Sequence, residues 1–272
     1  MSRHAQHPID RAVALERGDG GVFHGQTSPD YANMVGPFGG TTAATMLNSV
    51  LLDPRRLGDP VALTVNYAGP VVDGRFAIRA DALRTNRSTQ HWSVAMSQAD
   101  QICTSATAFF ATRRDTWTHT ETGFPEVPPA GDLARFDNAA MPPWTRCYDM
   151  RFVTGGRPST GQGVDELDSL SMLWIRDEPP RPLDFVSLTA ICDSFFPRII
   201  IRRPQWVPAG TVSLTVYFHA DAAQLQRHGA GPLLGVAKAS HFGLGYHDQT
   251  AEIWSAAGDL LATSHQIVYF KE

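Results

Sequence analysis

The sequence has few cysteines and lacks a long apolar run. Its three cysteines, Cys103, Cys147 and Cys192, are far apart and odd in number, which excludes a disulfide framework and a compact cysteine metal site. We expect reduced, packed thiols in a cytoplasmic protein. No apolar stretch is long enough for a membrane span, and the first residues lack a signal-peptide core, so we expect neither membrane insertion nor export.

An excess of basic residues is also missing. Lys and Arg number 23 against 27 Asp and Glu, which gives a formal net charge of −4. Without a basic field, nucleic acid is not an expected partner. His241, His247 and Asp248 lie near one another in the chain but lack the spacing of a ligand set, so no metal is expected. The hydrophobic fraction of 43% suffices for one large domain or two smaller ones.

One strand-like phrase occurs twice. "VALTVNYAG" covers residues 61–69, and "VSLTVYFHA" covers residues 212–220. Both alternate between apolar and polar residues, which predicts a half-buried strand. The expected inward side chains are Val61, Leu63, Val65 and Tyr67 in the first copy and Val212, Leu214, Val216 and Phe218 in the second.

A helical pattern is repeated as well. Five apolar residues at i, i+3, i+4, i+7 and i+8 predict a helix within residues 39–52, and five others predict one in "VSLTAICDSFFP". The first set is Ala43, Met46, Leu47, Val50 and Leu51; the second set, 145 residues later, is Leu188, Ile191, Cys192, Phe195 and Phe196.

Two terminal hairpins complete the repeat, with turns expected at Ala99-Asp100 and Ala257-Gly258. We therefore predict an N-terminal half at residues 1–118, a Pro/Gly-rich linker at 119–145 and a C-terminal half at 146–272. In each half an antiparallel sheet would cover a single apolar helix, which is an α+β architecture of the hotdog type. We expect the two halves to join into one continuous sheet, so that the chain is a double hotdog.

Several motifs resemble a known family and occur in its order. They are "GPFGG" at 36–40, "LRTNRS" at 83–88, "ICDSFFP" at 191–197, "TVSLTVYFH" at 211–219 and "GDLLATSHQ" at 258–266. Residues from about Val22 to Phe270 resemble the double-hotdog acyl-CoA thioesterases of the thioesterase II type. The resemblance implies a hydrolase of lipid metabolism that needs no cofactor and acts on acyl groups carried by CoA or an acyl carrier protein. It leaves acyl length and assembly into homo-oligomers open.

The resemblance also implies a catalytic trio of Asp193, Thr211 and Gln266. Asp193 would be the general base, while the hydroxyl and the amide hold the attacking water. From the residues alone, an exposed Asp193 without a role is the alternative. We expect the side-chain oxygens of the trio to lie about 3 to 6 Å apart, within reach of one water. Thr211 is expected on the same strand face as Ser213 and Thr215.

The first half is expected to carry a degenerate site. Asn48 lies opposite Asp193 and Pro60 opposite Thr211, while Gln266 falls opposite Thr107 or Ala108. Asparagine is no useful base, and proline has no hydroxyl. One competent site per chain follows.

Other residues are candidates for contacts with substrate. Gly39 and Gly40 open a helix, so their free N–H groups could bind an oxyanion, or the pair could be only a tight turn. Arg87 and Ser88 match a family segment near the substrate, and Arg87 could meet a CoA phosphate or remain solvated. Cys192 is an alternative nucleophile, but its apolar setting favours a packed thiol.

One departure from the family pattern keeps other functions open. Family members can carry histidines on the strand at residues 61–69, and this chain has none there. Because a fold does not fix a function, a non-catalytic acyl-thioester binding or pathway protein is the main alternative. A hotdog hydratase or dehydratase would change the acyl chain without releasing thiol.

Overall fold

An antiparallel sheet runs through the computed structural model, which describes residues 6–156, 165–203 and 205–271. The described residues form 13 strands in one sheet. The first half supplies β1 (Glu16–Arg17), β2 (Val22–Gln26), β3 (Asp59–Tyr67), β4 (Arg75–Thr85), β5 (Thr89–Gln98) and β6 (Gln101–Ala111). The second supplies β7 (Tyr148–Thr154), β8 (Ser171–Asp177), β9 (Ala209–Phe218), β10 (Leu233–Lys238), β11 (Phe242–Gly243), β12 (Tyr246–Ser255) and β13 (Leu260–Phe270).

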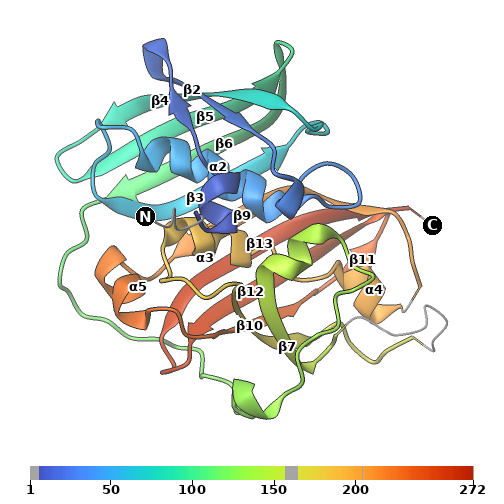
Figure 1. Cartoon of the computed structure of the whole chain (residues 1–272). Coiled ribbons are helices and arrows are strands. Elements are labelled where there is room, and N and C mark those ends of the chain that lie inside the picture. The colour runs from blue at the N-terminus through green and yellow to red at the C-terminus, as the bar shows by residue number, and fades with distance from the viewer. Residues whose placement is uncertain (1–5, 157–164, 204, 272) are drawn as a thin grey trace, which may run out of the picture.

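The strand order is symmetrical about the middle of the sheet. It runs β1-β2-β4-β5-β6-β3-β9-β13-β12-β10-β8-β7, with β11 paired to β12 off this path. The repeated phrases form β3 and β9, which pair with each other. Thr64 pairs with Thr215, its counterpart 151 residues later, and their hydroxyl oxygens are 3.1 Å apart. The prediction of a double hotdog with one continuous sheet is confirmed (Figure 1).

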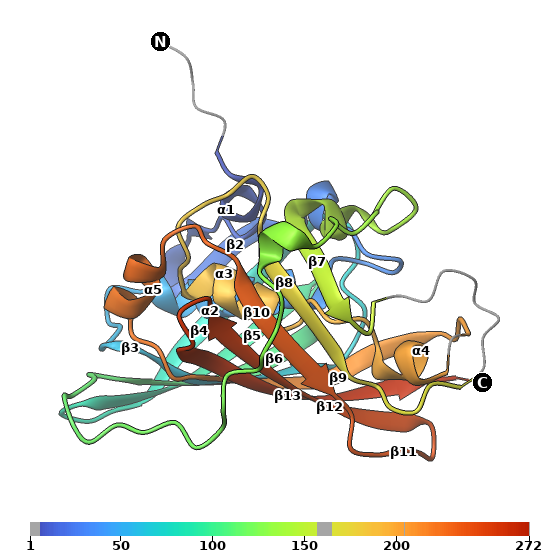
Figure 2. The same ribbon diagram turned by 90° about the horizontal axis from the view of Figure 1, so that it is seen from below.

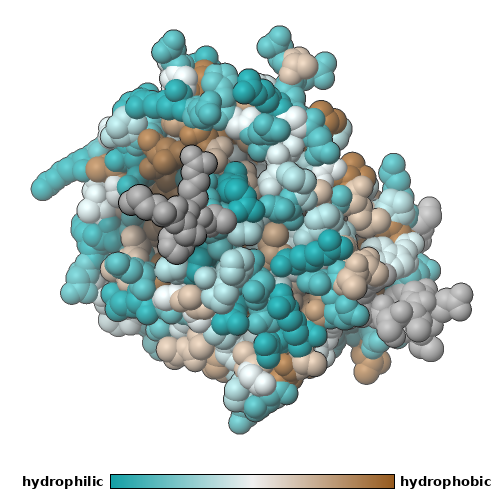
Figure 3. All heavy atoms as spheres, viewed as in Figure 1, coloured by the Kyte–Doolittle hydropathy of each residue, from teal (hydrophilic) through white to brown (hydrophobic). Residues whose placement is uncertain are grey.

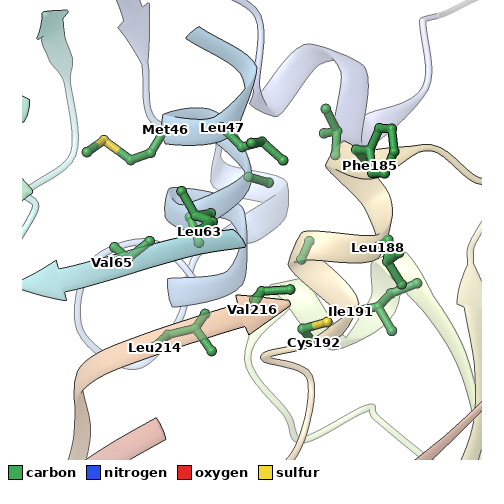
Figure 4. Close-up of a cluster of buried hydrophobic side chains, with 14 of the residues drawn as sticks. Met46, Leu47, Leu63, Val65, Phe185, Leu188, Ile191, Cys192, Leu214 and Val216 are labelled. Atoms are coloured by element: carbon green, nitrogen blue, oxygen red, sulfur yellow. The ribbon is translucent and has the colours of Figure 1, made fainter. Parts of the chain in front are cut away.

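Helices cover one face of this sheet (Figure 2). They are α1 (Pro8–Ala12), α2 (Gly39–Leu51), α3 (Phe185–Ile191), α4 (Arg198–Arg202) and α5 (Ala222–His228), with 3-10 turns η1 (Asp19–Gly21), η2 (Pro29–Tyr31), η3 (Ala130–Asp132) and η4 (Pro143–Cys147). Apolar side chains of α2 and α3 face those of β3 and β9, including Leu63, Val65, Leu214 and Val216, each fully buried (Figure 4). None of the described helices is long and apolar enough to cross a membrane.

The predicted helix at 39–52 is confirmed, but its counterpart is shorter than the apolar spacing predicted. α3 ends at Ile191, before Phe195 and Phe196. The N–H of Asp193 donates to the Ala190 carbonyl and that of Ser194 to the Ile191 carbonyl, so the backbone tightens into i to i+3 bonds. The Ser194 hydroxyl also donates to the Ile191 carbonyl. Asp193 therefore lies in a turn after the helix.

The two central strands contain bulges at equivalent positions. The register skips Val61 between Pro60 and Ala62 in β3, and it skips Val212 between Thr211 and Ser213 in β9. The expected inward position of Val61 and Val212 is therefore wrong, and so is the expected face of Thr211. A bulge reverses the alternation, so Thr211 lies on the helix-covered face with Leu214.

The predicted hairpins are confirmed. β5 and β6 are joined at Ala99-Asp100, where both residues have positive φ, and β12 and β13 are joined around Gly258. Between β6 and β7 the chain crosses the second half, where the Trp174 indole donates to the Pro128 carbonyl at 2.8 Å. The face seen in Figure 3 is mostly hydrophilic and carries small hydrophobic groups.

Candidate active site

Three polar side chains meet beside the beginning of α2. The Gln266 amide nitrogen donates to Oδ1 of Asp193 at 2.8 Å, and the Thr211 hydroxyl donates to Oε1 of Gln266 at 3.1 Å. Asp193 comes from the turn after α3, Thr211 from the bulged beginning of β9, and Gln266 from β13. The contacts are direct, and Gln266 links the other two residues. The structure thus brings the predicted trio together.

Burial makes the Asp193 carboxyl unusual. Asp193 is 8% exposed and Gln266 is 3% exposed. Loss of hydration raises the pKa of Asp193 from 3.8 to about 7, while the Gln266 amide and the Gly40 backbone N–H oppose this rise by stabilising the anion. Near neutral pH this carboxyl can therefore both accept and return a proton.

The glycine pair at the beginning of α2 is adjacent to this carboxyl. A Cβ on Gly39 would lie 2.7 Å from Oδ2 of Asp193, so the carboxylate can approach the helix only because that side chain is absent. A Cβ on Gly40 would lie 2.5 Å from the Ala190 carbonyl, at the contact between α2 and α3. The first N–H groups of a helix have no partner within it. Donors therefore lie next to a potential base.

Tyr67, which the alternation of the first repeated phrase predicts only as an inward side chain, also lies at this site. Its hydroxyl donates to the Gly39 carbonyl at 2.8 Å. Burial and the nearby Asp193 charge raise the pKa of Tyr67 well above its usual value, so the phenol stays protonated. The repeat contains a signal for this residue, because its counterpart at position 218 is phenylalanine.

Cys192 lies in the apolar core among side chains of α3 and the sheet (Figure 4). The thiol is fully buried, and burial raises the pKa of Cys192 far above the usual thiol value. A protonated, enclosed thiol is a poor nucleophile. Cys103 and Cys147 are likewise free and buried.

Arg87 and Ser88 are not brought to the trio. They occupy the turn between β4 and β5, where Thr89 pairs with Ala111, which in turn pairs with Asp59 at the beginning of β3. The trio lies beside the other end of β3. The two ends of this strand are separated by eight residues, or roughly 26 Å. A contact of Arg87 or Ser88 with substrate stays a prediction.

The repeat places a second group of residues, with different chemistry, at the positions equivalent to the trio and to Gly39-Gly40. We call this group the counterpart site; it consists of Asn48, Pro60 and Ala108 from the first half and Asp184 and Phe185 from the second. The register resolves the earlier choice between Thr107 and Ala108: Leu63 pairs with Ala108 as Leu214 pairs with Gln266. The Asn48 amide donates to the Val13 carbonyl at 2.9 Å. Asp184, the counterpart of Gly39, caps α3 by accepting from the Ser187 N–H at 2.8 Å.

Both halves of the chain match models of one protein family. Residues 28–111 match the model of the acyl-CoA thioesterase N-terminal domain, and residues 120–270 match that of the acyl-CoA thioesterase C-terminal domain. No curated protein sequence matches the chain.

Solved structures extend the likeness over nearly the whole chain. A hot dog fold protein of unknown function from Alicyclobacillus acidocaldarius is 48% identical, with a TM-score of 0.93 and coverage of 98% of this chain and 99% of that one. The acyl-CoA thioesterase II TesB2 from Mycobacterium marinum is 19% identical, with a TM-score of 0.76 and coverage of 97% and 98%. At that identity the second likeness concerns the fold alone.

Proposed function

Because the chain belongs to the acyl-CoA thioesterase family, we propose that it hydrolyses an acyl-CoA thioester to the free acid and CoA, with Asp193 as the general base. The observation that carries the proposal is the buried Asp193 carboxyl, held by Gln266 and placed beside the beginning of α2. A group with a pKa of about 7 suits proton transfer at neutral pH.

The proposed reaction begins with a water beside Asp193. The carboxylate takes a proton from this water while the water oxygen attacks the thioester carbonyl carbon. Gln266, itself held by the Thr211 hydroxyl, keeps the carboxylate in one orientation. The resulting tetrahedral intermediate carries negative charge on the former carbonyl oxygen, and N–H groups at the beginning of α2 would stabilise it.

Breakdown of the intermediate completes the proposed reaction. The carbon–sulfur bond breaks, the electron pair leaves with sulfur, and Asp193 returns its proton to the thiolate. The acid and the thiol leave, and Asp193 is again ionised. No covalent bond to the protein forms, which is consistent with the enclosed Cys192 thiol.

The proposal is tested by Asp193→Asn, with thiol release from a panel of acyl-CoAs followed by a colorimetric thiol reagent. Loss of a general base should lower kcat/KM by about 10²- to 10⁴-fold in a variant that remains folded. Asp177→Asn is the matched control. Asp177 is likewise buried, at 4% exposed, and burial raises its pKa to about 6, but it accepts a hydrogen bond from the Ser187 hydroxyl outside the trio. Turnover by folded Asp193→Asn equal to that of the control would exclude Asp193 as the base.

A further inference from the structure

The Tyr67 hydroxyl donates a hydrogen bond to one peptide group at the site. The carbonyl that accepts its hydroxyl hydrogen belongs to Gly39, and the N–H on the other side of the same peptide bond belongs to Gly40. A trans peptide is planar, with its C=O and N–H pointing in opposite directions. A hydroxyl that fixes the oxygen of this group therefore also fixes the direction of its N–H.

The Asp193 carboxylate lies against this peptide, since a Cβ on Gly39 would be 2.7 Å from its Oδ2. The Gly40 N–H stabilises the ionised carboxylate and so opposes the effect of burial on the pKa of Asp193. Donation by Tyr67 to the carbonyl should also polarise the amide and strengthen the N–H as a donor. The phenol, the Gly39–Gly40 peptide and the carboxylate thus form one chain of polar contacts.

The first turn of α2 lacks a side-chain cap, while the Phe38 ring anchors the residue before it by stacking on Trp144, with ring centroids 4.2 Å apart. Phe38, at the N-cap, provides no side-chain hydrogen bond to the helix, and the next two residues are glycines. Glycine has the largest backbone freedom, and uncapped helix ends fray. Neither glycine can be replaced without a close contact, since a Cβ would meet Asp193 at position 39 and Ala190 at position 40.

The counterpart site lacks each of these features. Phe218 stands in the place of Tyr67 and packs edge-on against Phe185, with ring centroids 5.6 Å apart. Asp184 stands in the place of Gly39 and caps its own helix. Of the two equivalent positions 67 and 218, the one with a hydroxyl therefore lies beside the uncapped helix and the buried Asp193 carboxyl, and the one without lies beside the capped helix.

We propose that Tyr67 is a positioning residue, whose hydroxyl holds the Gly39–Gly40 peptide so that the Gly40 N–H points into the Asp193 site. The inference rests on the proposed function for its catalytic meaning. The orientation of the peptide is, however, a property of the free protein, so it is measurable without any substrate.

The first experiment uses nuclear magnetic resonance on wild type, Tyr67→Phe and the control Tyr217→Phe. Tyr217 is a half-exposed tyrosine on β9. In Tyr67→Phe we expect the Gly40 amide to exchange about 3- to 10-fold faster, as for loss of one hydrogen bond. The Asp193 carboxyl should titrate higher by about 0.5 to 1 pH unit, because its anion loses a donor. Tyr67 and Cys192, the titratable neighbours of Asp193, stay protonated in this range.

The second experiment measures thiol release by the same three proteins. We expect kcat to fall by about 10-fold in Tyr67→Phe with little change in KM, and the acidic limb of the pH profile to move up with the Asp193 titration. Tyr217→Phe should match wild type. Unchanged Gly40 exchange and an unchanged Asp193 titration in Tyr67→Phe would overturn the proposal. If wild type releases no thiol from any acyl-CoA, the proposed function is wrong, and the resonance data alone still decide the role of Tyr67.

Discussion

The Asp193 site and the counterpart site begin from the same fold and differ in how their helices end. Asn48 lies inside α2, whose backbone continues through the bond from the Leu52 N–H to the Asn48 carbonyl. Asp193 lies beyond the end of α3 and faces the first turn of the opposite helix. An early helix end thus frees one acidic side chain for the site, while its counterpart is used to hold the N-terminal segment.

The beginnings of α2 and α3 also differ, in which residue brings a carboxylate to the first turn. Gly39 leaves room for a carboxylate from the other half, whereas Asp184 places its own carboxylate on the N–H groups of α3 and pairs with Arg181 at 2.7 Å. The Ser187 N–H in the first turn of α3 is therefore already bonded within its own half. Similar backbones therefore bring a carboxylate to both helix beginnings, from the opposite half at α2 and from the residue before the helix at α3.

Gly39→Ala tests whether the missing side chain distinguishes the two sites. The new methyl group would lie 2.7 Å from the Asp193 carboxylate and must displace it. Because a misplacement of about 1 Å can cost 10²-fold, we expect kcat/KM to fall by about that factor. Gly69→Ala, where a Cβ meets nothing within 4 Å, is the control. Equal turnover by the two variants would show that the close approach of Asp193 to α2 has no part in the reaction.

The pH dependence of activity tests the environment of Asp193. Since its pKa is raised to about 7 and the ionised form is the base, kcat/KM should rise about 10-fold per unit below pH 7 and level off above it. The measurement is thiol release over pH 5 to 9, with folding verified at each pH. An activity already at its plateau at pH 5 would contradict a desolvated base.

The same shift has a consequence for stability with a defined sign. A carboxyl whose pKa is raised on folding contributes stability that is fully present below its unfolded pKa of 3.8 and is lost progressively as the pH rises to about 7. Wild type should therefore lose stability relative to Asp193→Asn by roughly 2 kcal/mol between pH 5 and 8. Asp177, present in both proteins, cancels from the difference. Urea unfolding at pH 5 and pH 8 measures the difference in free energy of unfolding between the two proteins. The same difference at both pH values would argue against the raised pKa.

Cys192→Ala should have the smallest effect. The thiol is enclosed and protonated, so kcat/KM should change less than about twofold, while the cavity should lower stability by about 1 kcal/mol. Thiol release and thermal unfolding give the two values. A loss of activity as large as that of Asp193→Asn, in a stable variant, would assign the nucleophile to sulfur.

Much of the architecture could be predicted because the same strand and helix patterns occur twice in the sequence. Thr64 and Thr215 pair across the centre of the sheet, and they occupy the same place in the repeated phrase. The same repeat identified Asn48 as the counterpart of Asp193. Apolar periodicity failed where local hydrogen bonds override it: Phe195 and Phe196 keep helical spacing, yet the backbone bonds of Asp193 and Ser194 end α3 before them.

Details of the site depended on features without a periodic signal. The bulge at Val212 turns Thr211 toward Gln266, and strict alternation would have placed its hydroxyl on the other face. Tyr67 continues the apolar alternation of β3, so its hydroxyl gave no reason to separate it from the core. Its contact with Gly39 arises from the position of α2 above the sheet, which a single strand pattern does not contain.

The central claim is that each chain has one working site, built around Asp193. Its most direct test compares kcat/KM for thiol release between Asn48→Ala and Asp193→Asn, each corrected for the folded fraction. Asn48→Ala should lose stability, because the Val13 carbonyl loses its donor, but should keep turnover within about threefold of wild type. Asp193→Asn should lose about 10²- to 10⁴-fold. Equal losses in the two folded variants would contradict the assignment of hydrolysis to the Asp193 site alone.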